Sequence, residues 1–302
     1  MRTSNIVRAF ILGSLVEVAI PKPGNVSRLR DFPDLTFYHF LFANTSLIGP
    51  YMEAARRGEL LGEGVIDESN VGLGQLILIA TRESKRWQNA NPNFGVVTLS
   101  VPLIVSLSSG RPIERAGVYA SKLIEKSTPY DSINFYKAIR IANPKGIRRG
   151  VKYDVYDDSS FDELVMDNVN LYRLAEVSCP REMIFCEWLN GYLRVYEALN
   201  MLEGFIESED LENAVLKTFL NLLARYKDTL IERKAGTEEA ELVRRKAEFV
   251  VKGELTLEEF SNFMAEKGDL RNPGSLADIM AVALSLLFFK GYKLEGSFLC
   301  KS

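Results

Sequence analysis

Apolar side chains recur every three or four residues along most of this 302-residue chain. That spacing places them on one face of an α-helix. The pattern is clearest in the segments IVRAFILGSLVEVAI, LTFYHFLFANTSLIGPYMEAARRG, EMIFCEWLNGYLRVYEALNMLEGFI and SLADIMAVALSLLFFKG. It predicts an all-α protein, a single multi-helix bundle of about eleven or twelve helices.

Two shorter segments have a strand-like pattern, NFGVVTLSVPLIV and KYDVYD. The first is rich in β-branched residues, which favour strands, but no hairpin turn signal accompanies either segment. The clearest break in the helical pattern is the charge-dense stretch 143–163. A domain boundary there is one interpretation. Because neither half has a self-sufficient core pattern, we expect one helical domain over residues 1–302 with a polar loop near 143–163.

Composition narrows the class of protein. Apolar residues make up 47% of the chain and charged residues 25%, with a net charge of −3, as in ordinary globular proteins. There is no basic surplus to hold nucleic acid or an anionic membrane, so any anion site must be local. The apolar run MAVALSLLFF is too short to span a bilayer, and the N-terminus lacks a signal-peptide pattern. We expect a cytoplasmic protein, and a homodimer and a monomer both remain open.

The cysteines and the one histidine exclude several kinds of site. Cys179, Cys186 and Cys300 form no C-x-x-C pair, and we expect all three to be reduced, without metal or disulfide. His39 is the only histidine, which excludes two-histidine metal hydrolases and most zinc sites with histidine ligands. Its apolar, aromatic surroundings favour a structural role over a catalytic one.

The stretch PKPGNVSRLRD, residues 21–31, has more turn-forming residues than a helix end requires. Lys22 lies between two prolines, which hold its backbone extended and display its ammonium from a stiff segment. Gly24 would let a ligand approach the main chain. Further polar groups follow at Asn25, Ser27, Arg28, Arg30 and Asp31. Either this is a phosphate-binding loop or it is a rigid connection with solvated charges.

A second stretch, DESNVGLGQLILI at 67–79, would open a helix. Ser69 or Asn70 could cap that helix and direct its free backbone N–H groups at an anion. A capped core helix without a ligand is the alternative.

In a third stretch, RYKDTLIERKAG at 225–236, Asp228 and Glu232 lie four residues apart, and Arg233 and Lys234 follow. A carboxylate beside two cations suits a nucleotide and Mg²⁺. It also suits an ordinary helix end, because cations favour helix C-termini.

The fourth stretch is LRNPGSLADIMAVAL, residues 270–284. Asn272, Pro273 and Gly274 form a tight turn, and Ser275 and Asp278 have the spacing of a capping box. However, Asp278 lies in an otherwise apolar helix, where a buried carboxylate must be paired, hydrogen-bonded or bound to a metal.

In this order, the four stretches resemble those of the triphosphoribosyl-dephospho-CoA synthase family. The matching segments are Pro21-Lys22-Pro23-Gly24-Asn25, Ser69-Asn70-Val71-Gly72-Leu73-Gly74, Asp228-Thr229 through Gly236, and Pro273-Gly274-Ser275-Leu276-Ala277-Asp278. The resemblance implies an all-helical fold and a transferase that uses ATP and 3′-dephospho-CoA. Such enzymes move the triphosphoribosyl group of ATP to the acceptor and release adenine. The chain departs from the family's pattern by lacking histidines after the first stretch and in the second, so a related ribosylated acceptor is also open.

The resemblance also implies roles for single residues. We expect Asp228, Asp278 and Asp31 to be catalytic, with Mg²⁺ held by Asp228 and Asp278. We expect the nucleotide to be bound by Lys22, Gly24, Asn25, Arg28, Asn70, Arg233, Lys234, Asn272, Gly274 and Ser275. The alternatives are a nucleotide glycohydrolase on the same carboxylates, a nucleotide-binding regulatory protein without turnover, and a purely structural helical protein.

Overall fold

The computed structural model describes residues 2–147, 149–179 and 181–301, and it is predominantly α-helical. The α-helices are α1 (Arg2–Ala19), α2 (Phe37–Ser46), α3 (Ile48–Gly62), α4 (Leu73–Ser84), α5 (Phe94–Ser108), α6 (Ile113–Glu125), α7 (Pro129–Ala142), α8 (Ser159–Met166), α9 (Leu171–Ser178), α10 (Met183–Leu189), α11 (Leu193–Phe205), α12 (Leu211–Arg225), α13 (Thr229–Ala235), α14 (Thr237–Val251), α15 (Leu257–Glu266) and α16 (Gly274–Phe289). Two short 3₁₀ helices, η1 (Glu68–Asn70) and η2 (Gly268–Arg271), and two strands, β1 (Tyr292–Glu295) and β2 (Phe298–Lys301), complete the described chain.

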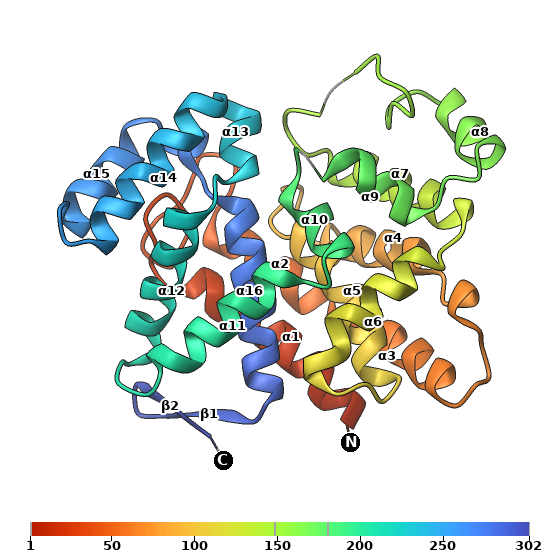
Figure 1. Ribbon diagram of the computed structural model, residues 1–302, viewed down its shortest axis with the longest axis horizontal. Helices are drawn as coiled ribbons and strands as arrows, with labels where there is room; N and C mark the ends of the chain where they lie inside the picture. The colour runs from red at the N-terminus through yellow and green to blue at the C-terminus, as the bar shows by residue number, and fades with distance from the viewer. Residues whose placement is uncertain (1, 148, 180, 302) are drawn as a thin grey trace.

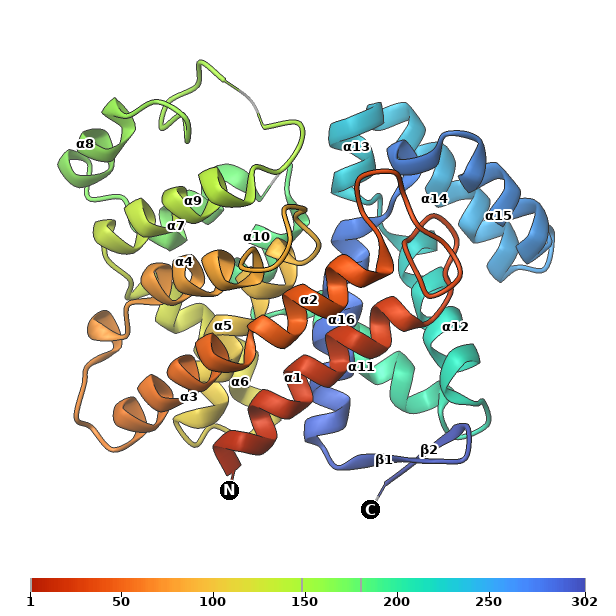
Figure 2. The ribbon, with the colours of Figure 1, turned by 180° about the vertical axis from the view of Figure 1, so that it is seen from behind.

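Helix α16 is the centre of the fold. It is apolar on all sides, and such a helix has to be buried. Figures 1 and 2 show α1, α11 and α16 between two groups of helices, α3–α9 on one side and α12–α15 on the other. Helix α1 packs closely on α16, since a Cβ placed on Gly13 would lie 2.3 Å from the Ser285 Oγ. One continuous set of buried apolar residues extends from Ile6 to Leu299 and includes both groups.

The all-α prediction is confirmed, but the described chain has more helices than the pattern predicts. The apolar segment around residues 35–58 is two helices, because the chain bends at Leu47 between α2 and α3. The segment 182–206 is also two helices, because Gly191 and Tyr192 have positive φ angles and separate α10 from α11. Apolar periodicity continues across such short breaks and therefore undercounts helices.

The segment NFGVVTLSVPLIV, which has a strand-like pattern, is helical. It forms α5, which is buried along most of its length, so packing on all sides overrides the β preference of its valines. Pro102 inside this helix cannot donate to the carbonyl of Thr98. The indole Nε1 of Trp188 donates to that carbonyl instead, at 3.2 Å. The described part of KYDVYD contains turns, whereas the antiparallel hairpin of β1 and β2 was not predicted.

The described residues of the polar stretch near 143–163 are irregular up to Asp158. Residue 148 lies outside the described residues. Helix α8 begins at Ser159, inside the predicted loop.

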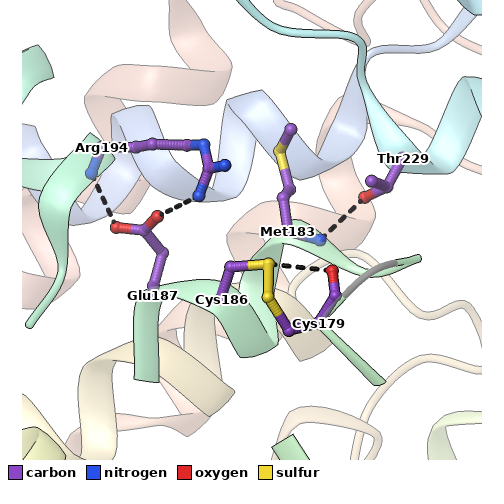
Figure 3. Close-up of a disulfide and its surroundings, with 6 residues drawn as sticks. All are labelled: Cys179, Met183, Cys186, Glu187, Arg194 and Thr229. Atoms are coloured by element: carbon purple, nitrogen blue, oxygen red, sulfur yellow. Dashed lines mark hydrogen bonds and ion pairs between the residues drawn. A yellow bond between two sulfur atoms is a disulfide. The ribbon is translucent and has the colours of Figure 1, made fainter. Parts of the chain in front are cut away.

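The cysteine prediction was wrong for one pair. Cys179 and Cys186 form a disulfide with their Cα atoms 4.6 Å apart (Figure 3). Seven residues along one helix would separate them by about 10 Å. Helix α9 ends at Ser178 and α10 begins at Met183, however, and this break brings the two residues together. Cys300 is a free, exposed cysteine.

Within the described residues, no single helix has both the length and the apolar character needed to cross a membrane, although α5 and α6 meet the criterion together as a pair bent by 114°.

Candidate active site

A cavity of about 1090 Å³ lies where α1, α5, α7, α10, α13 and α16 approach one another. Seven of the predicted site residues line it, namely Asn25, Arg233, Lys234, Asn272, Gly274, Ser275 and Asp278. Three of the four sequence stretches therefore meet at one site, although they are up to about 250 residues apart in the chain, as for Asn25 and Asn272.

Direct contacts join the first and fourth stretches. The Asn25 Nδ2 donates to the Asn272 Oδ1 at 3.0 Å, and both side chains are buried. Gly24 has a positive φ and packs against the turn at 271–273, where a Cβ would lie 2.7 Å from the Arg271 carbonyl oxygen. Gly24 therefore allows close contact between two protein segments. The predicted contact of Gly24 with a nucleotide is corrected, because its open side is filled by the turn at 271–273. The buried Oδ1 of Asn25 has no hydrogen-bond partner among the described residues, and Asn25 lines the cavity.

Asp228 joins the third and fourth stretches. Its Oδ1 accepts hydrogen bonds from the backbone N–H groups of Leu230 and Ile231, at 2.8 and 3.2 Å. Its Oδ2 accepts from the N–H of Leu276 at 2.8 Å, across to the first turn of α16. Burial raises the pKa of Asp228 to about 6, although these three N–H groups act in the opposite direction.

The predicted catalytic and metal-binding roles of Asp228 therefore need correction. The side chain is fully buried, both oxygens are used by backbone donors, and Asp228 is not among the described residues that line the cavity. It caps α13 and also occupies the N-terminus of α16, where the helix dipole favours an anion.

Asp278 lines the cavity one turn into α16, and together with Glu17 from α1 it makes up the cavity floor. Its carboxylate is seated against the start of α5, where a Cβ placed on Gly95 would come within 2.0 Å of the Asp278 Oδ2. Burial raises the pKa of Asp278 well above its usual range, and the negative charges of Glu17 and Asp228 raise it further. The N–H of Val96 and the more distant Arg233 oppose this effect.

Glu17 is a cavity residue that the sequence analysis did not identify. It is 6% exposed and comes from α1. The Phe10 carbonyl lies near Ser285 and Gly13 lies near Ala281, so α1 and α16 run antiparallel. Glu17 lies one turn after Gly13 on α1, and Asp278 lies one turn before Ala281 on α16, so the two carboxylates are neighbours. A signal was present, because Glu17 is the only acidic residue in the apolar segment NIVRAFILGSLVEVAI.

Lys22 is the partner of Glu17. Its Nζ lies 3.0 Å from the Glu17 Oε1 and donates to the carbonyls of Glu17 and Ile20 at the end of α1. The side chain of Lys22 is fully buried and the residue is not among the described cavity-lining ones, so its predicted contact with a phosphate is corrected. The two prolines hold Lys22 extended, and its ammonium points back into the protein. Burial raises the pKa of Glu17, whereas the Lys22 ammonium lowers it.

Cations line the side of the cavity formed by α13. Arg233 forms an ion pair with Glu182, and the Lys234 Nζ lies 3.3 Å from a carboxylate oxygen of Asp269. Lys85, at the end of α4, also lines the cavity and has no ion-pair partner within the described ranges. Burial lowers the pKa of Lys85. Lys85 was missed because nothing in its local sequence distinguishes it from a solvated helix end.

The second stretch does not reach the cavity, and the predicted role of Asn70 is corrected. Asn70 is exposed in η1, and the residue preceding α4 is Gly72. The N-terminus of α4 already has an internal anion, because the N–H of Gly74 donates to the Asp131 Oδ1 at 2.9 Å. The opposite end of α4, with Lys85, is the end that faces the cavity.

Two further predictions from the first stretch are corrected. Arg28 binds the Ala19 carbonyl and Glu212, away from the cavity. Asp31 is exposed, and its Oδ1 accepts from the N–H of Phe37 at the start of α2. By contrast, His39 lines the cavity, while its Nδ1 accepts from the Thr36 N–H as part of a capping box.

The residues present do not fit a magnesium ion held by Asp228 and Asp278. Asp228 has no free oxygen, and within the described part of the chain no group of three or more acidic, histidine or cysteine side chains is placed to hold a metal. Mg²⁺ usually keeps several waters and binds one or two carboxylates together with substrate phosphates. Any Mg²⁺ here would depend mainly on the substrate's own phosphates.

Comparisons with known proteins identify the family of the chain and a structure of similar fold. The sequence model of the ATP:dephospho-CoA triphosphoribosyl transferase family matches residues 3–296. A crystal structure from Archaeoglobus fulgidus, of a protein assigned as a triphosphoribosyl-dephospho-CoA synthase, superposes with a TM-score of 0.66 at 24% identity and covers 85% of this chain and 100% of its own. At that identity the likeness shows the fold. No curated protein matches the chain significantly. The family match spans nearly the whole sequence, and the chain therefore belongs to the ATP:dephospho-CoA triphosphoribosyl transferase family.

Proposed function

We propose that this cavity transfers the triphosphoribosyl group of ATP to 3′-dephospho-CoA and releases adenine. The observation that carries the proposal is one cavity with carboxylates on its floor and cations on its walls. Its volume of about 1090 Å³ lies just above the range of about 300–1,000 Å³ that is typical of single-ligand pockets. A cavity of this size suits two nucleotide substrates bound side by side.

Displacement of adenine from C1′ passes through an oxocarbenium-like state, as in glycoside transfer. Such a reaction needs neutralisation of the triphosphate, carboxylates near C1′ and the attacking hydroxyl, and a path for the leaving base. We assign triphosphate binding to Arg233, Lys234 and Lys85, which line the cavity. Asn25 and Asn272 would hold the sugar or the acceptor through neutral hydrogen bonds.

We propose that Mg²⁺ enters with ATP, bound by the phosphates. The carboxylates Glu182 and Asp269 beside Arg233 and Lys234 favour this arrangement, since they would lie near a phosphate-bound cation. No step of the chemistry is assigned to the ion.

The direct test is adenine release from ATP and Mg²⁺ by the purified protein, with and without 3′-dephospho-CoA. Adenine and the triphosphoribosyl product should form only when the acceptor is present. Equal adenine release without the acceptor would indicate a glycohydrolase, and ATP-induced thermal stabilisation without any adenine would indicate a nucleotide-binding protein that does not catalyse the transfer.

A further inference from the structure

The two carboxylates on the cavity floor have opposite surroundings. Glu17 is held by the Lys22 ammonium at 3.0 Å, and this ion pair is shielded from solvent. Asp278 forms no ion pair within the described residues. It faces the negative charges of Glu17 and Asp228, and Arg233 has only a weak effect on it. Two neighbouring carboxylates whose surroundings separate their protonation states are the usual basis for one acid and one base in a single site.

The shift directions agree with this contrast. Burial raises the pKa of both side chains, but Lys22 opposes the effect for Glu17, whereas two carboxylates reinforce it for Asp278. The surroundings therefore favour the protonated form of Asp278 more strongly than that of Glu17, which has Lys22 as a partner.

We propose that Asp278 is the general acid that protonates the leaving adenine and that Glu17 is the general base that accepts the proton of the acceptor hydroxyl. Lys22 is a positioning residue that keeps Glu17 ionised. This assignment rests on the proposed transfer reaction. It also replaces the metal-binding role expected for Asp278.

The chemistry balances without a further reactant. The acceptor oxygen forms a bond to C1′ as the bond from C1′ to N9 of adenine breaks. The hydroxyl proton passes to Glu17, and the proton of Asp278 passes to a ring nitrogen of adenine. Transfer of the proton from Glu17 to Asp278, directly or through water, restores both side chains for the next turnover.

The wall beside Asp278 suits a leaving purine. Phe94 precedes Gly95, the residue in contact with the Asp278 carboxylate, and it lines the cavity with Phe135 and Phe185. The rings of Phe94 and Phe135 are stacked, with centroids 5.9 Å apart, and Phe185 meets Phe135 edge-on. Aromatic faces bind nucleobases by stacking, so adenine on this wall would lie next to the proposed acid.

The assignment is tested with 7-methyl-ATP, whose base is already cationic and leaves without protonation. Transfer to 3′-dephospho-CoA is measured for the wild type, Asp278→Asn and Glu17→Gln. With ATP, both variants should lose on the order of 100- to 10,000-fold in rate. With 7-methyl-ATP, Asp278→Asn should recover to near the wild-type rate, whereas Glu17→Gln should remain slow.

Equal losses for Asp278→Asn with both substrates would overturn the acid assignment, as would its rescue by added Mg²⁺ with ATP. Because the rate with 7-methyl-ATP is measured on the same preparation, a recovered rate also shows that the variant folds. If the wild type transferred from neither substrate, the proposed function itself would be wrong. That outcome differs from failure of the acid–base assignment, in which the wild type remains active.

The role of Lys22 is tested by the pH dependence of kcat. The charged or titratable groups facing Glu17 and Asp278 are Lys22, Asp228, Arg233 and Tyr51. Replacing Lys22 with Met removes the cation that pairs with Glu17 and should shift the acidic limb of the profile to higher pH. Lys22→Arg should restore the wild-type limb. A loss of rate without a shift of the limb would show that Lys22 is only structural and would overturn its assignment.

Discussion

Two pairs of carboxylates inside the fold differ in what surrounds them. Asp131 and Asp228 have both oxygens occupied by backbone or hydroxyl donors. Asp131 accepts from Gly74 and from Thr128, and Asp228 accepts from three N–H groups. Glu17 and Asp278 line the cavity, and no side-chain donor other than Lys22 binds either of them within the described residues.

The difference shows how to separate carboxylates that hold the fold from carboxylates available for chemistry. A buried carboxylate that accepts several N–H bonds at a helix N-terminus stabilises that junction. A carboxylate that faces a cavity with few donors has a perturbed pKa and remains available to a substrate. Asp228 and Asp278 looked equivalent in the sequence, and only their partners distinguish them.

Among substitutions that leave all four carboxylates in the chain, the largest effect on activity should come from Gly95→Ala. The new Cβ would lie 2.0 Å from the Asp278 Oδ2 and 2.6 Å from its Cγ, so the carboxylate must move. We expect kcat for adenine release to fall by roughly 100-fold, because a misplaced catalytic group costs about that much. Steady-state kinetics check this, and an unchanged kcat would argue against Asp278 acting from its present position.

A smaller effect is expected from Arg233→Ala, which removes a cation from the cavity wall. The KM for ATP should rise roughly 10- to 100-fold, as for loss of a charge-assisted hydrogen bond, with a smaller change in kcat. Arg245→Ala, at an exposed position on α14, is the matched control and should leave KM unchanged. Equal KM changes in the two variants would contradict the assigned phosphate role.

Asp131→Asn should act on stability alone. An amide cannot accept from both Gly74 and Thr128, so one buried donor loses its partner. We expect a loss of about 1–3 kcal/mol in the free energy of unfolding, with kcat and KM of the folded protein unchanged. Chemical denaturation measures the first and kinetics the second, and a fall in kcat without a change in stability would contradict the account.

The smallest effect should come from Gly49→Ala in α3. Apart from its chain neighbours and the adjacent helix backbone, no described atom lies within 4 Å of a Cβ at this position, and alanine favours a helix. The variant should gain about 0.5–1 kcal/mol of stability with unchanged activity. It is the control for Gly95→Ala, because the chemical change is the same and only the surroundings differ.

The sequence predicted the helical class, and three of the four stretches that it singled out line the cavity. Those stretches were identifiable because their turn residues and charges are unusual within single segments. Asn70 was misplaced because its local pattern resembles an anion-binding helix start, and only the direction of α4 reveals that the other end faces the cavity.

The remaining differences also have physical causes. Lys22 was expected to face a ligand, but the direction of its side chain depends on Glu17, a residue on a neighbouring helix. The segment that forms α5 has strand-like composition, and its burial against several helices overrides that preference. Unusual residues could be identified from the sequence. The residues that they contact could not, because those contacts are set by tertiary packing.

The most direct test of the account compares Asp278→Asn with Asp228→Asn for both turnover and thermal stability. Asp278→Asn should lose on the order of 1,000-fold in adenine release from ATP while its Tm stays within a few degrees of the wild type. Asp228→Asn should lose about 2–3 kcal/mol of stability while its folded fraction keeps near-normal turnover. The opposite pattern, with Asp228→Asn inactive but stable and Asp278→Asn active but unstable, would contradict the assignment of chemistry to the cavity floor.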